Sequence, residues 1–258
     1  RQVGFQETDI VNIIKPITKF SYKLKNASEI KYILEKGYHI ATSGRPGPVL
    51  IDIPMDFQRK ELNFKRLKGF KSKKKLIKVN ILNKKIIQIQ KKLKNSSRPI
   101  IILGGGIKYA RAEKKISLFL KNFDIPIVST WSGLDLIDHR NKNYIGNIGV
   151  YGSRAANFSV QNSDLFLCIG SRLDTRVTGG VPKSFARSAY KIVVDVDKNE
   201  LNKKRGLEID LKVNEDINDF VSRYLKIKKY KIKKNKWLNQ CIKWKKKYLI
   251  TNENNKDK

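Results

Sequence analysis

Arg98-Pro-Ile-Ile-Ile-Leu-Gly-Gly-Gly106 is the stretch that decides the fold of this chain. Its apolar run at 99–103 is typical of a strand buried on both faces of a parallel sheet. The three glycines that follow leave the backbone open to a phosphate at the start of the next helix. Apolar residues at helical spacing precede the strand at 82–93 and follow it at 112–120, which predicts a strand between two helices.

The same alternation continues along the chain. Apolar runs at 125–129, 165–169 and 192–196 predict further strands, with helices around 154–160 and 217–225. Strands that alternate with helices form parallel βαβ units, so the sequence predicts a doubly wound α/β domain. Ligands of such sheets bind beyond the carboxyl ends of the strands. The loops that follow the strands are therefore the candidate site.

These loops have a consistent chemistry. Gly170-Ser-Arg-Leu-Asp-Thr-Arg176 follows one strand and combines two arginines with an aspartate, and Asp195-Val-Asp197 places a carboxylate where a ribose hydroxyl could bind. The glycine run lacks the Gly-x-Gly-x-x-Gly spacing and no acid ends the second strand, which speaks against an ordinary NAD site. Each loop taken alone also fits a tight turn with a surface ion pair of ~0–1 kcal/mol. Together the three loops favour a nucleotide pocket.

An earlier α/β unit is indicated by Ser43-Gly-Arg-Pro-Gly-Pro-Val-Leu-Ile-Asp-Ile-Pro54. The prolines and glycines fix the turn around Arg45, and the apolar run at 49–53 predicts a strand buried on both faces. Such an arginine either binds a phosphate or carboxylate or is simply solvated. A strand at 16–22 and a helix capped by Asn26 or Ser28 complete this unit.

Charge, cysteines and hydropathy exclude several classes of protein. The net charge is +33, but the lysines are spread along the whole chain and no helix-turn-helix, zinc-finger or RNP-type motif accompanies them, so we expect compositional bias and no specific nucleic acid. No stretch approaches the ~20 apolar residues of a membrane span. Cys168 and Cys241 lack metal or redox spacing, which indicates free thiols in a reducing, cytoplasmic setting. His39 and His139 are isolated and fit surface or packing roles.

Taken together, these motifs resemble the thiamine-diphosphate-dependent enzymes of the acetolactate synthase type. The resemblance runs from the first residue to about 225, in order and spacing. The matching stretches are Phe5-Gln-Glu, Pro16-Ile-Thr-Lys19, Gly44-Arg-Pro-Gly-Pro-Val-Leu-Ile-Asp-Ile-Pro54, Gly104-Gly-Gly106, Ala156-Asn-Phe158 with Asn162-Ser-Asp164, and Arg172-Leu-Asp-Thr-Arg-Val-Thr-Gly179.

The resemblance implies a domain organisation. Residues 1–58 would be the C-terminal part of a pyrimidine-binding domain, 59–78 a basic linker, and 79–226 a Rossmann-like central domain. Residues 227–258 would be a basic connector helix towards a diphosphate-binding domain. The family's activating glutamate and its Gly-Asp-Gly segment for Mg²⁺ would lie outside this chain, so the chain alone is expected to be inactive.

The resemblance also implies an activity. The parent enzyme, a transferase or lyase of branched-chain amino acid biosynthesis, would decarboxylate a 2-oxo acid and join the product to an acceptor with thiamine diphosphate and Mg²⁺. It would be a homodimer or homotetramer. Gln6 would lie near the thiamine and Lys19 near the acid substrate, and no metal ligand is expected within the chain. The residues that would contact FAD in the central domain are Arg45, Gly105, Thr130, Trp131, Ile148, Gly149, Val150, Tyr151, Gly170, Ser171, Arg172, Leu173, Asp174, Arg176, Asp195, Val196, Asp216 and Ile217.

Three departures from the family pattern leave alternatives open. Thr175 stands where these enzymes usually have a second aspartate, Gly149-Val-Tyr-Gly152 where they have Gly-Met-His-Gly, and Trp131 where they have a smaller aliphatic residue. FAD, ADP and no nucleotide all remain open for the central domain. The parent could be a paralogous decarboxylase or carboligase of sugar or surface-polysaccharide metabolism. In another class, the chain would be a non-catalytic nucleotide-binding module, or a nucleic-acid-binding protein.

Overall fold

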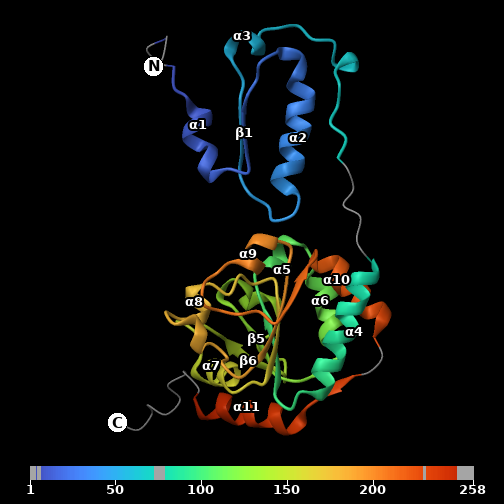
Figure 1. Cartoon of the computed structure of the whole chain (residues 1–258), viewed down its shortest axis with the longest axis vertical. Coiled ribbons are helices and arrows are strands. Elements are labelled where there is room, and N and C mark those ends of the chain that lie inside the picture. Colours follow the sequence, from blue (N-terminus) through green and yellow to red (C-terminus); the bar gives the residue numbers. More distant parts are fainter. Residues whose placement is uncertain (1–3, 5–6, 73–78, 229–230, 249–258) are drawn as a thin grey trace. The chain divides into compact units, whose positions relative to one another are not determined.

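A computed structural model describes residues 4, 7–72, 79–228 and 231–248. The chain divides into two compact units, Arg1–Leu76 and Ile77–Lys258 (Figure 1). None of the helices within the described ranges combines the length and apolar character that a membrane crossing requires.

The first unit is built around two parallel strands, β1 and β2, which pair from Phe20 with Val49 to Lys23 with Asp52. The predicted strand at 16–22 begins later than expected, because residues 15–17 form a 3-10 turn with Pro16 at its second position. The strand at 49–53 was expected to be buried on both faces. All four residues of β2 are instead only partly buried. The elements are α1 Ile10–Ile14, β1 Phe20–Lys23, α2 Ile30–Thr42, β2 Val49–Asp52 and α3 Met55–Gln58.

The chain after α3 contacts α2 again at Phe70. The backbone N–H of Phe70 donates a hydrogen bond of 2.6 Å to Glu35 Oε2. The Phe70 ring contacts the rings of Tyr32 and His39, with centroids 5.6 and 5.4 Å apart. Within the segment predicted to be a linker, Phe70 therefore packs onto the first unit, whereas residues 59–66 are exposed and 73–78 lie outside the described residues.

The second unit contains a six-stranded, fully parallel sheet in the order β6-β5-β3-β7-β8-β9. Its order reverses at β3, which confirms the predicted doubly wound fold. The predicted stretch at 98–103 forms the inner strand β3, and all of its residues are buried. The sequence did not reveal β6 or β9, whose four residues each are not continuously apolar. The strands are β3 Pro99–Leu103, β5 Ile127–Ser129, β6 Tyr144–Asn147, β7 Leu165–Ile169, β8 Tyr190–Asp195 and β9 Leu211–Asn214.

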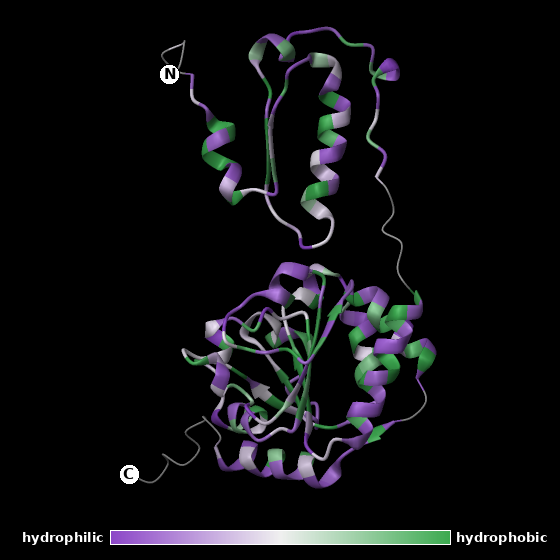
Figure 2. Cartoon of the chain, in the orientation of Figure 1, coloured by the Kyte–Doolittle hydropathy of each residue, from purple (hydrophilic) through white to green (hydrophobic). Residues whose placement is uncertain are grey.

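Alternate residues of the strands enter two separate cores. Ile101 and Leu103 pack with α4, α6 and α10 on one face, and Ile100 and Ile102 pack with α7 and α11 on the other. Figure 2 shows the strands as hydrophobic and the outer helix faces as largely hydrophilic. The helices are α4 Val79–Asn95, α6 Glu113–Leu120, α7 Arg154–Gln161, α10 Ile217–Ile227 and α11 Asn235–Lys247, with the short α5 Gly106–Tyr109, α8 Thr175–Thr178 and α9 Lys198–Asn202, and a small strand pair of β4 Phe123–Asp124 with β10 Ile232–Lys233.

The helix predicted to be a connector, α11, packs against α7 and contributes to the second core. Cys241 on this helix is fully buried, and the Trp237 indole N–H donates a hydrogen bond of 3.2 Å to the Pro99 carbonyl at the start of β3. Burying an aromatic side chain of this size stabilises a fold by roughly 1.5–3 kcal/mol. The described part of α11 is therefore an integral layer of the second unit.

Candidate functional site at the carboxyl edge of the sheet

The loops after β3 and β7 are packed tightly together. The N–H of Gly104 donates to the Ile169 carbonyl at 2.9 Å, and the N–H of Gly106 donates to the Gly170 carbonyl at 2.8 Å. A Cβ atom on Gly104 would lie 2.2 Å from the Gly170 oxygen. Glycine is required here because one backbone approaches another. The expectation that this run is wholly open to a phosphate is wrong for the N–H groups of Gly104 and Gly106, which both have internal acceptors.

Gly105 has a different reason to be glycine. Its φ is −61° and it precedes α5, a helix of a single turn. A Cβ atom there would lie 2.7 Å from Ser132 Oγ, so close packing against the segment after β5 excludes a side chain. In the same segment, the N–H of the buried Thr130 donates to the Leu103 carbonyl at 2.8 Å. The ends of β3 and β5 are thus tied together.

The loop after β7 has two residues with left-handed backbone, Gly170 at φ 68° and Leu173 at φ 50°. Leu173 is fully buried, and its N–H donates to Ser171 Oγ at 3.3 Å. A left-handed conformation is costly for a non-glycine residue and is concentrated at functional sites. Arg172 lies between the buried Ser171 and the buried Leu173 and is itself exposed at the strand end.

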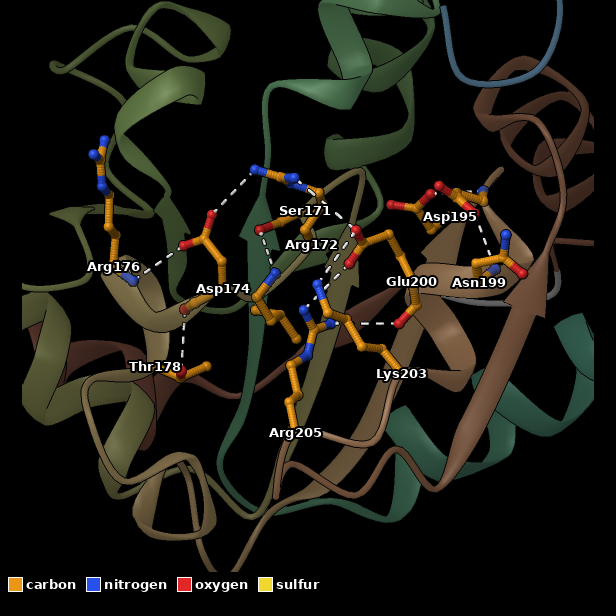
Figure 3. A network of polar contacts seen from close by, with 12 residues as sticks. Ser171, Arg172, Asp174, Arg176, Thr178, Asp195, Asn199, Glu200, Lys203 and Arg205 are labelled. Carbon is orange, nitrogen blue, oxygen red and sulfur yellow. Dashed lines mark hydrogen bonds and ion pairs between the residues drawn. The ribbon is translucent and has the colours of Figure 1, made fainter. Parts of the chain in front are cut away.

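Arg172 belongs to a network of charges that connects neighbouring strand ends (Figure 3). Its guanidinium lies 3.5 Å from Asp174 Oδ2 and 4.0 Å from Glu200 Oε1. Glu200 is also 3.3 Å from Arg205 and 4.0 Å from Lys203. The sequence analysis missed Glu200, Lys203 and Arg205. The only signal for them was an acid and two bases shortly after the Asp195-Val-Asp197 stretch.

Four of the expected residues, together with Thr175, line an open pocket of about 360 Å³. The four are Trp131, Val150, Tyr151 and Arg176. The Trp131 and Tyr151 rings meet edge to face, with centroids 5.3 Å apart. Figure 3 shows the Arg176 side chain pointing away from Asp174. Arg172 and Arg176 were expected in one loop with Asp174; of the two, Arg172 lies in the charge network and Arg176 lines the pocket.

The loop that carries Val150 and Tyr151 is fixed from two sides. The side-chain amide of Asn157 accepts from the Gly149 N–H and donates to the Gly149 carbonyl, both at 3.0 Å. The Val150 N–H donates to the Arg176 carbonyl at 2.9 Å, so two walls of the pocket are joined. Beneath them Ile148 is buried. Asn157 was noted only as part of a family motif.

The end of β8 supplies the third loop. Asp195 accepts the Asp197 N–H at 2.8 Å through Oδ1, and the Asn214 side chain donates to the Val196 carbonyl at 2.8 Å. Asp216 caps α10. A Cβ atom on Gly170 would lie 2.9 Å from Ile217 Cδ1, so the start of α10 packs beside the β7 loop.

The remaining expected residues lie in the first unit. The Lys19 ammonium donates to the carbonyl of Ile40, to Ser43 at 2.8 Å and to Arg45 at 2.9 Å. Burial lowers the pKa of Lys19. An ammonium has three donors, and here all three bind carbonyls at the end of α2 and in the turn that carries Arg45. Gln6 lies outside the described residues.

Both cysteines are buried, free thiols. Burial raises the pKa of the Cys241 thiol to about 12 and raises that of Cys168 further, with the Asp195 charge adding to the shift at Cys168. High thiol pKa values make both groups poor nucleophiles. Neither is a candidate for covalent catalysis.

Comparison with known proteins places the second unit in a family. Residues 86–224 match the family described as "Thiamine pyrophosphate enzyme, central domain". The acetolactate synthase large subunit of Lactococcus lactis subsp. lactis (strain IL1403) is 32% identical over 255 residues, which cover 97% of this chain and 43% of that relative. The corresponding subunit of Cyanidium caldarium is 35% identical over 258 residues, which cover 96% and 44%.

A third relative, the acetolactate synthase isozyme 2 large subunit of Escherichia coli (strain K12), is 33% identical over 212 residues, covering 81% of this chain and 37% of the relative. The chain thus spans less than half the length of these relatives. The family match extends over more than half of the chain and includes the strands β3 to β9 with their loops. The chain therefore belongs to the thiamine pyrophosphate enzymes and contains their central domain.

Proposed function

We propose that this chain forms part of a thiamine-diphosphate-dependent enzyme of the acetolactate synthase type, and that its central domain binds the diphosphate of a nucleotide at the carboxyl edge of the sheet. The observation that supports the nucleotide site is the position of Arg172, which extends from the loop after β7. Its contacts to carboxylates within the described ranges are long, at 3.5 and 4.0 Å. When bound to the whole enzyme, thiamine diphosphate would supply the carbanion chemistry of 2-oxo acid decarboxylation.

The residues at this edge fit a nucleotide diphosphate. A guanidinium 3.5 and 4.0 Å from its carboxylates is farther than the ~2.7–2.9 Å of a strong charged hydrogen bond, so a diphosphate can compete for it. The backbone N–H groups of Ser171 and Arg172 have no hydrogen-bond acceptor among the residues that the structure describes. Asp195 at the end of β8 supplies a carboxylate for a ribose. These three features together would hold the ADP portion of FAD.

The pocket beside this edge supports a second candidate. Trp131 and Tyr151 are both exposed, and they meet edge to face at its wall. The large indole stands where the family usually has a smaller side chain, which favours a ligand without the flavin ring. ADP in a paralogous decarboxylase or carboligase is the corresponding alternative, while FAD remains our first proposal for the whole enzyme.

The first unit has its own proposed roles, in the thiamine and substrate sites of the whole enzyme. We place it at the end of the pyrimidine-binding domain, with Gln6 near the thiamine and Lys19 near the acid substrate. The three carbonyl contacts of Lys19 support a further role, which is to hold the turn that carries Arg45. Mg²⁺ binding and assembly into a homodimer or homotetramer also belong to this proposal for the whole enzyme.

Calorimetric titration of the chain with ADP and with FAD tests the nucleotide site. We expect Arg172→Ala to weaken binding by ~1.5–3 kcal/mol, the range for a hydrogen bond to a charged group. Arg187→Ala is the matched control, because Arg187 is exposed in the segment before β8, at the opposite edge of the sheet. The proposal for this site is wrong if neither nucleotide binds, or if both variants bind like the original chain.

The activity needs a separate test. The segment of the Lactococcus lactis large subunit that corresponds to this chain can be replaced by the chain, and acetolactate formation measured with thiamine diphosphate and Mg²⁺. We expect the hybrid to form acetolactate. A folded hybrid that consumes a 2-oxo acid but forms another product would favour the paralogue. The absorbance near ~450 nm of a hybrid purified without added cofactor reports whether flavin is retained.

A further inference from the structure

Glu200 lies at the centre of the charge network described above. It belongs to α9, directly after β8, and its side chain is only 13% exposed. Arg205, at 15% exposure, forms the shortest ion pair with it at 3.3 Å, and a second nitrogen of the same guanidinium donates to the Glu200 carbonyl at 3.4 Å. The Glu200–Arg205 ion pair is therefore nearly buried and hydrogen-bonded, and it anchors the charge network.

Arg172 lies beside this ion pair without making a short hydrogen bond to Glu200. Its Nη1 atom lies 4.0 Å from Glu200 Oε1, and its Nη2 atom lies 3.5 Å from Asp174 Oδ2 on the other side. Figure 3 shows the guanidinium between these two carboxylates. At such distances the carboxylates attract and orient the charge, while its N–H donors stay accessible to another acceptor.

The backbone adds to the fixed position of this arginine. Gly170 and Leu173, two residues before and one residue after it, both have left-handed φ angles, and Leu173 is anchored in the core. A strained backbone of this kind persists only where its surroundings hold it. The loop therefore presents Arg172 at a defined place, and the two carboxylates limit how its long side chain moves.

We propose that Glu200 is a positioning residue: from α9 it orients the Arg172 guanidinium towards the diphosphate of a nucleotide at the carboxyl ends of β7 and β8. This inference rests on the nucleotide site proposed above. Arg172, Lys203 and Arg205 lie within 4.0 Å of the Glu200 carboxylate and offset its charge, so repulsion of the ligand is small. The gain is that Arg172 loses little conformational freedom on binding.

A double-mutant cycle on the chain, with ADP as the probe in calorimetry, tests this role. We expect Glu200→Gln to raise the Kd for ADP about three- to tenfold, because an unrestrained arginine must then be ordered by the ligand. In the Arg172→Ala background the same change should have no further effect, since coupled residues are non-additive. Glu208→Gln, which removes the same charge from an exposed residue before β9, should leave the Kd unchanged.

Stability is controlled with a second variant. Glu200→Gln together with Arg205→Gln removes both charges of the nearly buried pair and so leaves no unpaired buried charge. Tryptophan fluorescence during urea unfolding confirms that each variant is folded. The paired variant should show the same three- to tenfold rise in Kd if the Glu200 carboxylate orients Arg172.

The outcomes separate the two proposals. If the original chain does not bind ADP, or Arg172→Ala binds as well as the original, the nucleotide site itself is wrong and the role of Glu200 with it. If Arg172→Ala weakens binding but Glu200→Gln does not, only the positioning role is overturned. An additive effect of the two changes likewise overturns it, because Glu200 would then act independently of Arg172.

Discussion

Replacing Gly104 with alanine should destabilise the second unit strongly, although the substitution adds only one methyl group. The new Cβ atom would lie 2.2 Å from the Gly170 oxygen, 2.5 Å from Ser171 Cβ and 2.6 Å from the Gly170 carbonyl carbon. Two of these three atoms belong to backbone, which cannot rotate away. The loops after β3 and β7 must therefore separate.

The magnitude follows from what that separation breaks. The hydrogen bonds from Gly104 to Ile169 and from Gly106 to Gly170 join the same two loops, and each contributes ~0.5–1.5 kcal/mol. Overpacking adds ~1–3 kcal/mol. Alanine offsets ~0.4–1 kcal/mol of this loss in stability, because it lowers the conformational entropy of the unfolded chain. We expect a net loss of about 2–4 kcal/mol in the free energy of unfolding, to which the overlap and the broken hydrogen bonds contribute about equally.

Urea unfolding followed by tryptophan fluorescence measures this loss. All three tryptophans lie in the second unit, so the signal does not report the first. With an urea m-value of ~2 kcal/mol/M, the midpoint should fall by about 1–2 M. Two other glycines serve as controls, because a Cβ atom on Gly179 or Gly180 would have open space around it.

The controls separate overlap from backbone strain. Gly179 has φ 80°, so Gly179→Ala should cost ~1 kcal/mol through strain alone. Gly180→Ala should stay within ~0.5 kcal/mol of the original, as a surface change. A midpoint for Gly104→Ala close to that of Gly180→Ala would refute the reasoning, since the two loops would then not be in contact.

Two more predictions concern the second unit. Burial raises the pKa of the Cys241 thiol from 9.0 to about 12. Its contribution to stability is therefore fully present below pH 9 and is lost as the pH rises to about 12, because only the unfolded thiol is ionised within this range. Cys241→Ser should reduce the fall in urea midpoint between these pH values, and an unaltered fall would contradict the assigned burial. Asn157→Ala removes both hydrogen bonds to Gly149, which together contribute ~1–3 kcal/mol. Amide hydrogen exchange at residues 148–152 should therefore accelerate. Equal exchange rates would show that other contacts hold the loop.

The inner strands could be predicted because their signal is local. The runs at 99–103 and 165–169 are continuously apolar, and both become fully buried strands. The four-residue edge strands β6 and β9 could not be predicted, since they mix apolar and polar residues and gain their pairing only from the assembled sheet. Short strands of this kind depend on tertiary context.

The site was predictable to a lesser degree. The arginine loop and the carboxylate after β8 follow from the rule for ligands of parallel sheets. Glu200 was missed because its contacts with Arg172 join residues 28 positions apart with no motif between them. The three carbonyl contacts of Lys19 were equally hidden, because backbone acceptors leave no trace in residue type. The left-handed backbone of Leu173 was also unexpected, because leucine rarely adopts this conformation.

The segment 59–72 also changes where the first unit should be cut. A truncation after Gln58 would follow the end of α3. It would nevertheless remove the contacts of Phe70 with Tyr32 and His39 and the hydrogen bond that the Glu35 carboxylate accepts from the Phe70 N–H. A protein engineer who transplants this unit into another enzyme should therefore carry residues 59–72 with it. The described part of the predicted linker therefore belongs to the unit that has to be transplanted.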